Sequence, residues 1–223
     1  MRLYLSSYRL GRHPEALVKL MRGATHIGVI PNAGDGYKTD DPNLLHPWLD
    51  RESQALRDIG LEPHVFDLKP YFKQPAQHIR TALAQFDALW VLGGNSFVLR
   101  RAFRLSGFDE VLPGLLQADE LVYAGYSAGI DQLCPSLHGV ELVDDPHHIP
   151  DGYPNQIIWD GLGLLPYSIA PHYKSDHPEA AAMDDSVQYL IDHHLPFIAL
   201  RDGEEIIVDG EVTTITSVTN SKE

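Results

Sequence analysis

The sequence contains one cysteine, Cys134, so the chain cannot form an internal disulfide bond. Nothing therefore requires an oxidising compartment, and we expect a cytoplasmic protein. No apolar run approaches the roughly 20 residues that a membrane-spanning helix needs. The first residues, Met-Arg-Leu-Tyr-Leu-Ser-Ser, lack the apolar stretch of a signal peptide and predict a first strand instead. These absences argue against a disulfide framework and against a membrane partner.

Positive charge is also scarce, because 17 lysines and arginines face 31 aspartates and glutamates, giving a formal net charge of −14. A nucleic-acid partner needs a basic face, so the composition argues against that class of function. The net charge does not exclude a small-molecule substrate, since a local basic pocket can form in an acidic protein.

The 12 histidines show no zinc-binding spacing. There is no H-E-x-x-H motif and no cysteine pair, and the adjacent pairs His147-His148 and His193-His194 are expected in surface loops. We therefore predict no metal site.

The sequence does contain short apolar strands that alternate with amphipathic helices. Several strands are almost continuously apolar, as expected when both faces of a sheet are covered. This pattern predicts an α/β fold with a mostly parallel central sheet flanked by helices on both faces. In the absence of a linker or repeat, residues 1–223 are expected to form one domain. The expected strands are 2–6, 26–31, 63–67, 88–92, 121–124, 166–173 and 196–200, with a hairpin from Glu205 that turns at Asp209-Gly210; the expected helices are 13–22, 43–60, 75–85, 96–105, 109–118 and 178–193; and 138–163 is expected to hold loops and at most a short hairpin.

Residues 121–130 run from an apolar strand directly into Gly-Tyr-Ser-Ala-Gly, which has the pattern G-x-S-x-G. A serine at a sharp strand-to-helix turn is held at the end of the strand, and small neighbours relieve the crowding there. The N–H groups that begin the next helix point to the same place and can stabilise an oxyanion. Ser127 is therefore the predicted nucleophile, and the alternative interpretation is a plain tight turn.

A serine hydroxyl needs a base within hydrogen-bond reach, and the base needs an orienting acid. His172 is the predicted base because it ends an apolar strand and follows the stiff Pro171. Asp202 is the predicted acid because it follows the strand Phe-Ile-Ala-Leu, although Asp-Gly is also a common turn pair. The other acids that remain open are Glu204 and Glu205, and also Asp144, Asp145 and Asp160, which precede His172 as the acid does in α/β-hydrolases.

The turn Gly93-Gly94-Asn95 ends another apolar strand. As structure, it leads into a helix that Asn95 or Ser96 caps. As function, its bare N–H groups would pair with the N–H of Ala128 to form an oxyanion hole, which is the interpretation we favour. A phosphate cradle is a third interpretation, but neither G-x-G-x-x-G nor a Walker loop is present.

Four motifs occur in a fixed order along most of the chain. They are Gly-Gly-Asn-Ser-Phe at 93–97, Gly-Tyr-Ser-Ala-Gly-Ile at 125–130 followed by Cys134-Pro135, Pro171-His172-Tyr173, and Leu200-Arg201-Asp202-Gly203. In this order and spacing they resemble the peptidase E family, serine peptidase family S51, which includes aspartyl dipeptidase. The resemblance implies an α/β sandwich like that of class I glutamine amidotransferases. It also implies a triad in the order Ser127, His172 and Asp202.

The reaction implied by the resemblance is hydrolysis of a dipeptide or small peptide through an acyl-enzyme, without a cofactor. Aspartyl dipeptidases carry a basic Gly-Glu-Thr-Arg-type segment soon after the histidine, and this chain has His177-Pro-Glu-Ala-Ala-Ala-Met-Asp-Asp there. Lys174 and Arg201 are the alternative sources of positive charge, so Asp-X specificity stays open. The competing functions are an esterase with the hydrolase order of residues and a non-catalytic, amidotransferase-like binding protein. We expect a monomer or a homodimer.

Overall fold

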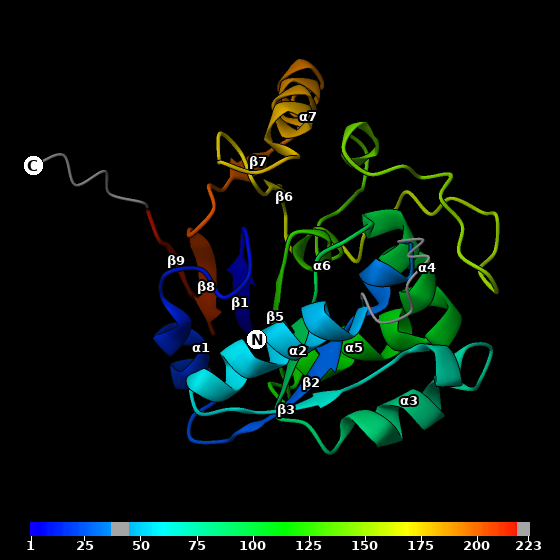
Figure 1. Ribbon diagram of the computed structural model, residues 1–223, viewed down its shortest axis with the longest axis vertical. Helices are drawn as coiled ribbons and strands as arrows, with labels where there is room; N and C mark the ends of the chain where they lie inside the picture. The colour runs from blue at the N-terminus through cyan, green and yellow to red at the C-terminus, as the bar shows by residue number, and fades with distance from the viewer. Residues whose placement is uncertain (37–44, 218–223) are drawn as a thin grey trace, which may run out of the picture.

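The computed structural model describes residues 1–36 and 45–217, and Figure 1 shows a central sheet with helices on both sides. Among these residues the sheet has seven strands in the spatial order β3-β2-β4-β5-β1-β8-β9. From β3 to β1 neighbouring strands are parallel, and the hairpin β8–β9 adds an antiparallel edge. The predicted, mostly parallel α/β sheet is confirmed. Its strands are β1 (Arg2–Ser6), β2 (His26–Ile30), β3 (Glu62–Val65), β4 (Ala88–Val91), β5 (Val122–Tyr126), β8 (Glu205–Asp209) and β9 (Val212–Ile215).

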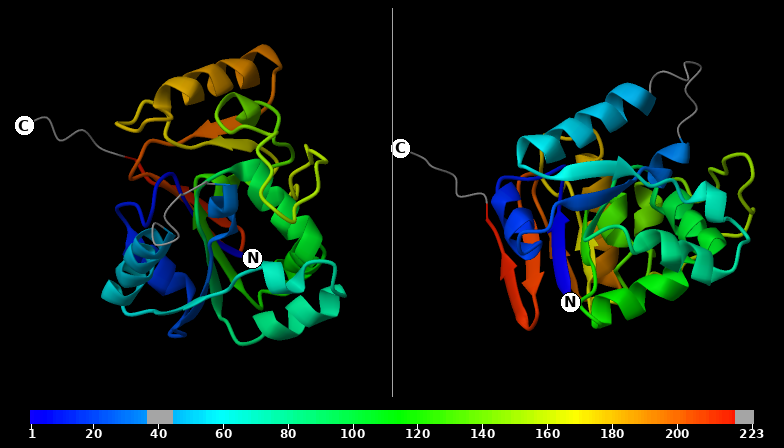
Figure 2. Two further views of the ribbon diagram at one scale, coloured as in Figure 1. Left: turned by 45° about the vertical axis from the view of Figure 1, so that its right-hand side comes forward. Right: turned by 90° about the horizontal axis from the view of Figure 1, so that it is seen from below.

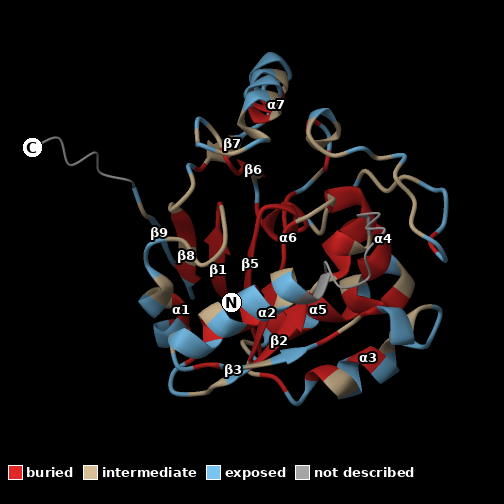
Figure 3. Cartoon of the chain, viewed as in Figure 1, coloured by how far each residue is buried: buried red, intermediate tan, exposed pale blue. Residues whose placement is uncertain are grey.

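Helices cover both faces of the sheet, and each face has its own apolar core. Side chains alternate along a strand, so Leu3 and Leu5 enter one core while Tyr4 enters the other. Figure 3 shows the buried central strands and the exposed outer faces of the helices. None of the described helices is long and apolar enough to cross a bilayer. The helices are α1 (Pro14–Leu20), α2 (Leu45–Asp58), α3 (Ala76–Leu83), α4 (Ser96–Ser106), α5 (Phe108–Gln117), α6 (Ala128–Asp131) and α7 (Ala180–Asp192), with 3-10 turns η1 (Asn32–Gly36), η2 (Lys69–Tyr71) and η3 (Val140–Leu142).

The two cores use different helices. Helices α1 and α2 pack on the face that carries Tyr4, whereas α3, α4 and α5 pack on the face that carries Leu3 and Leu5. The expected helix 43–60 begins at Leu45 in the structure, and its first two predicted residues lie outside the described residues.

The strand expected over 166–173 is too long. It is only β6 (Ser168–Ala170), which pairs in parallel with β7 (Phe197–Ala199) as a separate two-stranded sheet. Pro171 has no N–H to donate, and His172 has a φ of 60°, so the extended chain ends before the histidine. The small sheet and α7 lie together at one end of the molecule (Figures 1 and 2).

Residues 138–163 form loops and η3, and the short hairpin does not form. The backbone of this segment is bound instead by Arg101, which is fully buried in α4. Its guanidinium donates to the carbonyl oxygens of Pro146 at 2.6 Å and Gln156 at 2.9 Å. A loop whose carbonyls bind a side chain cannot use them in a strand ladder.

Candidate active site

The turn at Ser127 joins the carboxyl end of β5 to α6. Ser127 has a φ of 49° and a ψ of −124°, a combination that L-residues rarely adopt, and it is 9% exposed. A Cβ on Gly129 would lie 2.4 Å from the Val91 carbonyl oxygen, and one on Gly125 would lie 2.7 Å from the same atom. The small residues of the motif are therefore required because β4 packs against the turn. The predicted strand–turn–helix geometry is confirmed.

The turn that follows β4 lies directly beside this serine. A Cβ on Gly93 would be 3.1 Å from the Cβ of Ser127. Gly94 has a φ of 133°, and a Cβ there would meet the Ala33 carbonyl oxygen at 2.6 Å. The structure thus brings the two glycine-rich strand ends together, as the sequence predicts.

Asn95 has a structural role in this turn. Its N–H donates to the Ala33 carbonyl oxygen at 3.0 Å, and its Oδ1 caps α4 by accepting from the Val98 N–H at 2.9 Å. The Asn95 N–H is therefore engaged, whereas the N–H groups of Gly94 and Ala128 have no hydrogen-bond acceptor among the described residues.

His172 and Asp202 form a hydrogen-bonded pair. His172 Nδ1 lies 2.7 Å from Asp202 Oδ1, and the histidine side chain is only 1% exposed. The Asp202 N–H donates to Ser175 Oγ at 2.8 Å, which fixes the acid in turn. Because an ionised carboxylate only accepts, the shared proton belongs to Nδ1, and in a neutral ring the lone pair is then on Nε2.

Ser7 ties this pair to the main sheet. It follows the last residue of β1, and its Oγ accepts from the His172 N–H at 2.8 Å. The same hydroxyl donates to Asp202 Oδ1 at 2.9 Å. One side chain therefore holds both the backbone of the histidine and the carboxylate. The sequence analysis does not identify Ser7, although a serine pair directly after the first strand, at the same sheet edge, is a signal for it.

The pKa of Asp202 lies below its ordinary value. Burial raises this pKa, but the hydrogen bond and the charge of His172, together with the Ser7 hydroxyl, lower it by more. The carboxylate is therefore ionised at neutral pH and can stabilise a histidine that gains a proton.

Asp202 is the one acid of the six candidates that reaches His172 Nδ1 among the described residues. Asp160 is exposed, and its backbone carbonyl oxygen accepts a hydrogen bond from Arg100 Nε at 2.7 Å. The remaining four carboxylates accept hydrogen bonds elsewhere: Asp144 from the Ser96 N–H, Asp145 from the His147 N–H, Glu204 from the Arg201 N–H, and Glu205 from the N–H groups of Arg12 and His13.

No hydrogen bond joins Ser127 to His172 within residues 1–36 and 45–217. Tyr8 contacts residues on both sides. Its ring centroid is 5.6 Å from that of His172 and 6.0 Å from that of Tyr126, the residue before the serine. Hydrogen bonds between a nucleophile and its base are often long in a free enzyme and tighten when substrate binds.

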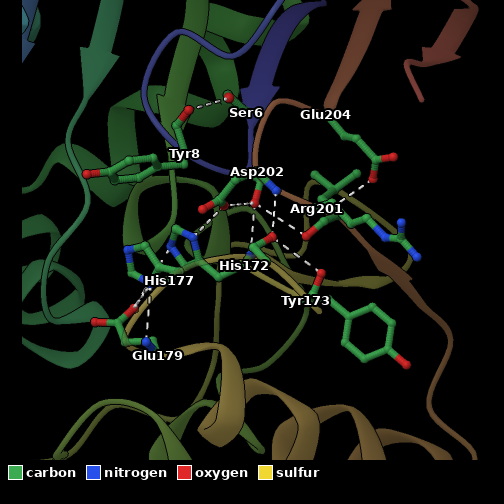
Figure 4. Close-up of polar contacts among 12 residues, drawn as sticks. Ser6, Tyr8, His172, Tyr173, His177, Glu179, Arg201, Asp202 and Glu204 are labelled. Carbon is green, nitrogen blue, oxygen red and sulfur yellow. Dashed lines mark hydrogen bonds and ion pairs between the residues drawn. The ribbon is translucent and has the colours of Figure 1, made fainter. Parts of the chain in front are cut away.

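His177 and Glu179 lie beside His172, as Figure 4 shows. The two imidazole rings stack with centroids 3.7 Å apart and planes at 7°. Glu179 directly precedes α7, and its Oε2 lies 3.9 Å from His172 Nε2 and 3.9 Å from His177 Nδ1. Burial, followed by the charge of His172, lowers the pKa of His177. A carboxylate therefore stands near the nitrogen that would exchange a proton with a serine nucleophile.

Two further carboxylates lie at the start of α4, bridged by Ser96. The Ser96 N–H donates to Asp144 Oδ2 at 2.7 Å, and its hydroxyl donates to Asp131 Oδ2 at 2.9 Å. Burial raises the pKa of Asp144 to about 6. Burial, reinforced by the charge of Asp144, raises the pKa of Asp131 well above its ordinary value. No sequence pattern predicts that Asp131 and Asp144 meet at Ser96, because their positions depend on contacts with α4.

The atoms of His172, His177 and Glu179 that could bind a metal all lie within 4.8 Å of one another. An imidazole holds a metal in the plane of its ring, along the lone pair. Two parallel rings stacked at 3.7 Å cannot both meet this requirement. The arrangement therefore suits hydrogen bonding to a ligand better than metal coordination.

The two predicted sources of positive charge are placed on the surface. Lys174 is exposed, and its Nζ lies 4.9 Å from the ring centroid of Tyr173. Arg201 is exposed, and its guanidinium extends away from the stacked histidines in Figure 4. The structure therefore gives neither residue a position inside the site.

Known proteins resemble this chain in both sequence and fold. The model of the family described as Peptidase family S51 matches residues 9–216. The protein named "Probable alpha-aspartyl dipeptidase" in Drosophila melanogaster is 30% identical over 181 residues, which cover 78% of this chain and 70% of that protein. "Peptidase E" of Streptomyces coelicolor is 31% identical over 137 residues, which cover 58% of this chain and 51% of that protein.

Two solved structures share the fold. A Listeria monocytogenes protein described as a candidate peptidase E superposes with a TM-score of 0.76 at 21% identity and covers 98% of both chains. A peptidase from an acI-B1 actinobacterium superposes with a TM-score of 0.68 at 14% identity, covering 97% of this chain and 87% of that one. The family match also confirms the expected fold, which is like that of class I glutamine amidotransferases.

Proposed function

Because the chain belongs to peptidase family S51, a family of serine-type dipeptidases, we propose that it hydrolyses dipeptides or small peptides through Ser127, His172 and Asp202. The proposal rests on the 2.7 Å contact between His172 Nδ1 and Asp202 Oδ1, together with the strained strand-end turn that holds Ser127. An oriented base and a hydroxyl at a strand end are the parts that acyl transfer needs.

The reaction begins when Ser127 Oγ attacks the carbonyl carbon of the scissile bond and its proton passes to His172 Nε2. Asp202 stabilises the imidazolium that forms. His172 then donates the proton to the departing amine, which breaks the C–N bond and leaves an ester on the serine. A water molecule attacks this ester while His172 removes its proton. Return of that proton to Ser127 Oγ releases the carboxylic acid product.

The oxyanion of each tetrahedral intermediate needs hydrogen-bond donors that are free in the resting enzyme. The N–H groups of Gly94 and Ala128 meet this condition among the described residues, and the two turns that carry them are in contact through Gly93 and Ser127. Gly93 serves by lacking a side chain, and Asn95 serves by fixing the turn.

Asp-X dipeptides are the first substrates to test, because the Drosophila relative is named as an aspartyl dipeptidase. The exposed positions of Lys174 and Arg201 give no support for either residue as the cation that would bind an aspartate side chain. The proposal therefore concerns the reaction and small peptides as substrates, acting as a monomer or a homodimer. An esterase with the hydrolase order has less support, since Asp202 and not Asp160 contacts the histidine.

The experiment is hydrolysis of a panel of dipeptides and aminoacyl p-nitroanilides, led by Asp-Leu and Asp-p-nitroanilide. Ser127→Ala is expected to lower kcat by about 10⁴-fold or more, and Asp202→Asn by about 10⁴-fold because the imidazole loses its tautomer. Thermal melts of both variants control for folding. Activity that survives Ser127→Ala, or a wild-type protein that cleaves no panel member, contradicts the proposal.

A further inference from the structure

Two histidines and a glutamate meet at the amino ends of β2 and β3. His26 begins β2, and Glu62 begins β3 directly opposite it in the parallel register. His64 is two residues after Glu62, so its side chain lies on the same face of the sheet. The possible ligand atoms of the three side chains all lie within 4.8 Å of one another. This group is at the opposite end of the parallel strands from Ser127, which follows the carboxyl end of β5.

The distances within this group fit a zinc ion. Neighbouring ligand atoms of a tetrahedral zinc site are about 3.3 Å apart, because each bond to the metal is about 2.0–2.1 Å long. His26 Nε2 lies 3.5 Å from Glu62 Oε2. The ring centroids of His26 and His64 are 5.9 Å apart, and two imidazoles on one zinc ion have centroids about 5–6 Å apart.

The two imidazoles are also able to turn toward an ion. His26 and His64 are both exposed, so each ring can rotate about its Cβ–Cγ bond and direct a lone pair at the metal. The stacked pair formed by His172 and His177 differs in both respects. Its rings are 3.7 Å apart, and the His172 side chain is only 1% exposed. Of these two groups, the one on β2 and β3 is therefore the better metal site.

The charge of the group on β2 and β3 matches a divalent cation. Glu62 and Asp87 both lie within 4.0 Å of His26, and neither carboxylate forms an ion pair with a lysine or arginine among the described residues. Two ionised carboxylates beside two neutral imidazoles are neutralised by one divalent ion. Imidazole nitrogen is a ligand that zinc accepts, whereas Mg²⁺ and Ca²⁺ take oxygen ligands. The donor set therefore favours zinc.

Hydrogen bonds to neighbouring residues hold these ligands in place. The His26 N–H donates to Asp87 Oδ2 at 3.2 Å, and the Asp87 N–H donates to the His26 carbonyl oxygen at 2.9 Å. The Thr25 hydroxyl donates to Glu62 Oε1 at 2.9 Å, while Glu62 Oε2 is the oxygen near His26. His26 Nδ1 lies 4.0 Å from Asp87 Oδ2. A carboxylate beside the second nitrogen of a ligating histidine sets its tautomer and orientation.

We propose that His26, Glu62 and His64 bind one Zn²⁺ ion, with water completing the coordination and Asp87 as the outer partner of His26. The ion joins β2 to β3, the edge strand of the main sheet, and so stabilises the folded chain at that edge. This site is separate from the proposed peptidase reaction. Closely spaced zinc motifs do not reveal it, because strand pairing brings His26 to Glu62 from a distant part of the chain.

Calorimetry with ZnCl₂ tests the site, on untagged protein that has been treated with EDTA and desalted. We expect one zinc ion per chain with a Kd of about 1–10 μM, and no comparable binding of MgCl₂. Zinc at about tenfold above Kd should raise the Tm by about 3–6 °C. His26→Gln and His64→Gln should each weaken binding by about 30-fold or more and reduce the Tm rise to below about 1 °C. Asp87→Asn should weaken binding by about tenfold.

His177→Gln is the matched control, because it removes a histidine from the other group of possible ligands, and it should bind zinc as wild type does. In EDTA the His26→Gln and His64→Gln proteins should melt within about 2 °C of wild type, since both side chains are exposed. A wild-type protein that binds no zinc below about 100 μM overturns the proposal. Binding that survives both ligand variants, or that is lost in His177→Gln, overturns it too. Stoichiometric binding lost only in the ligand variants supports the site, whether or not the protein cleaves peptides.

Discussion

The two halves of the site are built in different ways. Ser127 and the Gly93-Gly94 turn are fixed by backbone packing at the ends of adjacent strands β5 and β4. His172 and Asp202 lie outside the main sheet, after the short strands β6 and β7, and depend on side-chain hydrogen bonds from Ser7 and Ser175. The position of the proposed nucleophile therefore depends on the sheet, whereas the proposed base and acid require contacts between residues far apart in the chain. Each half should fail in its own manner when it is disturbed.

The largest expected effect is a loss of stability in the half of the site that backbone packing fixes, the turn at Ser127. In Gly129→Ala the new methyl group would lie 2.4 Å from the Val91 carbonyl oxygen, and backbone cannot move aside as a flexible side chain does. The variant should lose about 3 kcal/mol or more of unfolding free energy, with a fall in Tm of about 6–12 °C.

Gly114→Ala is the matched control, because a Cβ there meets nothing within 4 Å and the residue lies inside α5. It should raise stability by about 0.5–1 kcal/mol. Thermal and urea unfolding measure both variants. If the Gly129→Ala protein is as stable as the control, the turn can relax around the new methyl group. Backbone packing would then not fix the position of Ser127, contrary to the contrast drawn between the two halves.

A moderate effect is expected in the other half of the site, where side-chain hydrogen bonds hold His172 and Asp202. Ser7→Ala removes the acceptor for the His172 N–H and a donor to Asp202, while the fold keeps its backbone packing. We expect kcat to fall about tenfold, with a loss of about 1 kcal/mol of stability, because two buried hydrogen bonds are lost. Ser6→Ala, which removes only a 3.3 Å hydrogen bond to the Tyr8 carbonyl, should leave kcat within about twofold. If both variants behave alike, Ser7 does not position the pair.

The last effect, which involves no loss of activity and appears only as the pH rises, concerns Asp144 at the start of α4. Its folded pKa is raised from 3.8 to about 6, so the stability this group contributes is fully present below its unfolded pKa and is lost as the pH rises through the folded pKa. Asp144→Asn has no such loss. Its Tm should match that of wild type near pH 4 and exceed it by about 2–6 °C at pH 7.5, for about 1–2 kcal/mol.

Melting curves of substrate-free protein at the two pH values check this expectation. A difference between the variants that is the same at both pH values would show that Asp144 is not destabilised by its ionisation.

The sequence predicts the first half of the site more fully than the second. Apolar runs of period two and the glycines around Ser127 encode local geometry, so the strand, the turn and the helix start follow from neighbouring residues. The same reasoning selects His172 and Asp202, whose side chains are in contact in the structure. It misjudges the strand before the histidine, because Pro171 and a φ of 60° at His172 end that strand early. His177 and Glu179 have no local signature that identifies their contacts.

By itself, the amino-acid sequence determined the alternation of strands and helices, the mostly parallel sheet and the serine turn, because these depend on hydrophobic periodicity and on residues close in the chain. Only the tertiary structure decided which acid contacts His172, since six candidates had the right chemistry and one had the right position. It also decided that Glu179 lies beside the histidine without a lysine or arginine partner among the described residues. Hydrogen bonds and uncompensated charge depend on distances of a few ångströms between distant segments, and no local pattern specifies those distances.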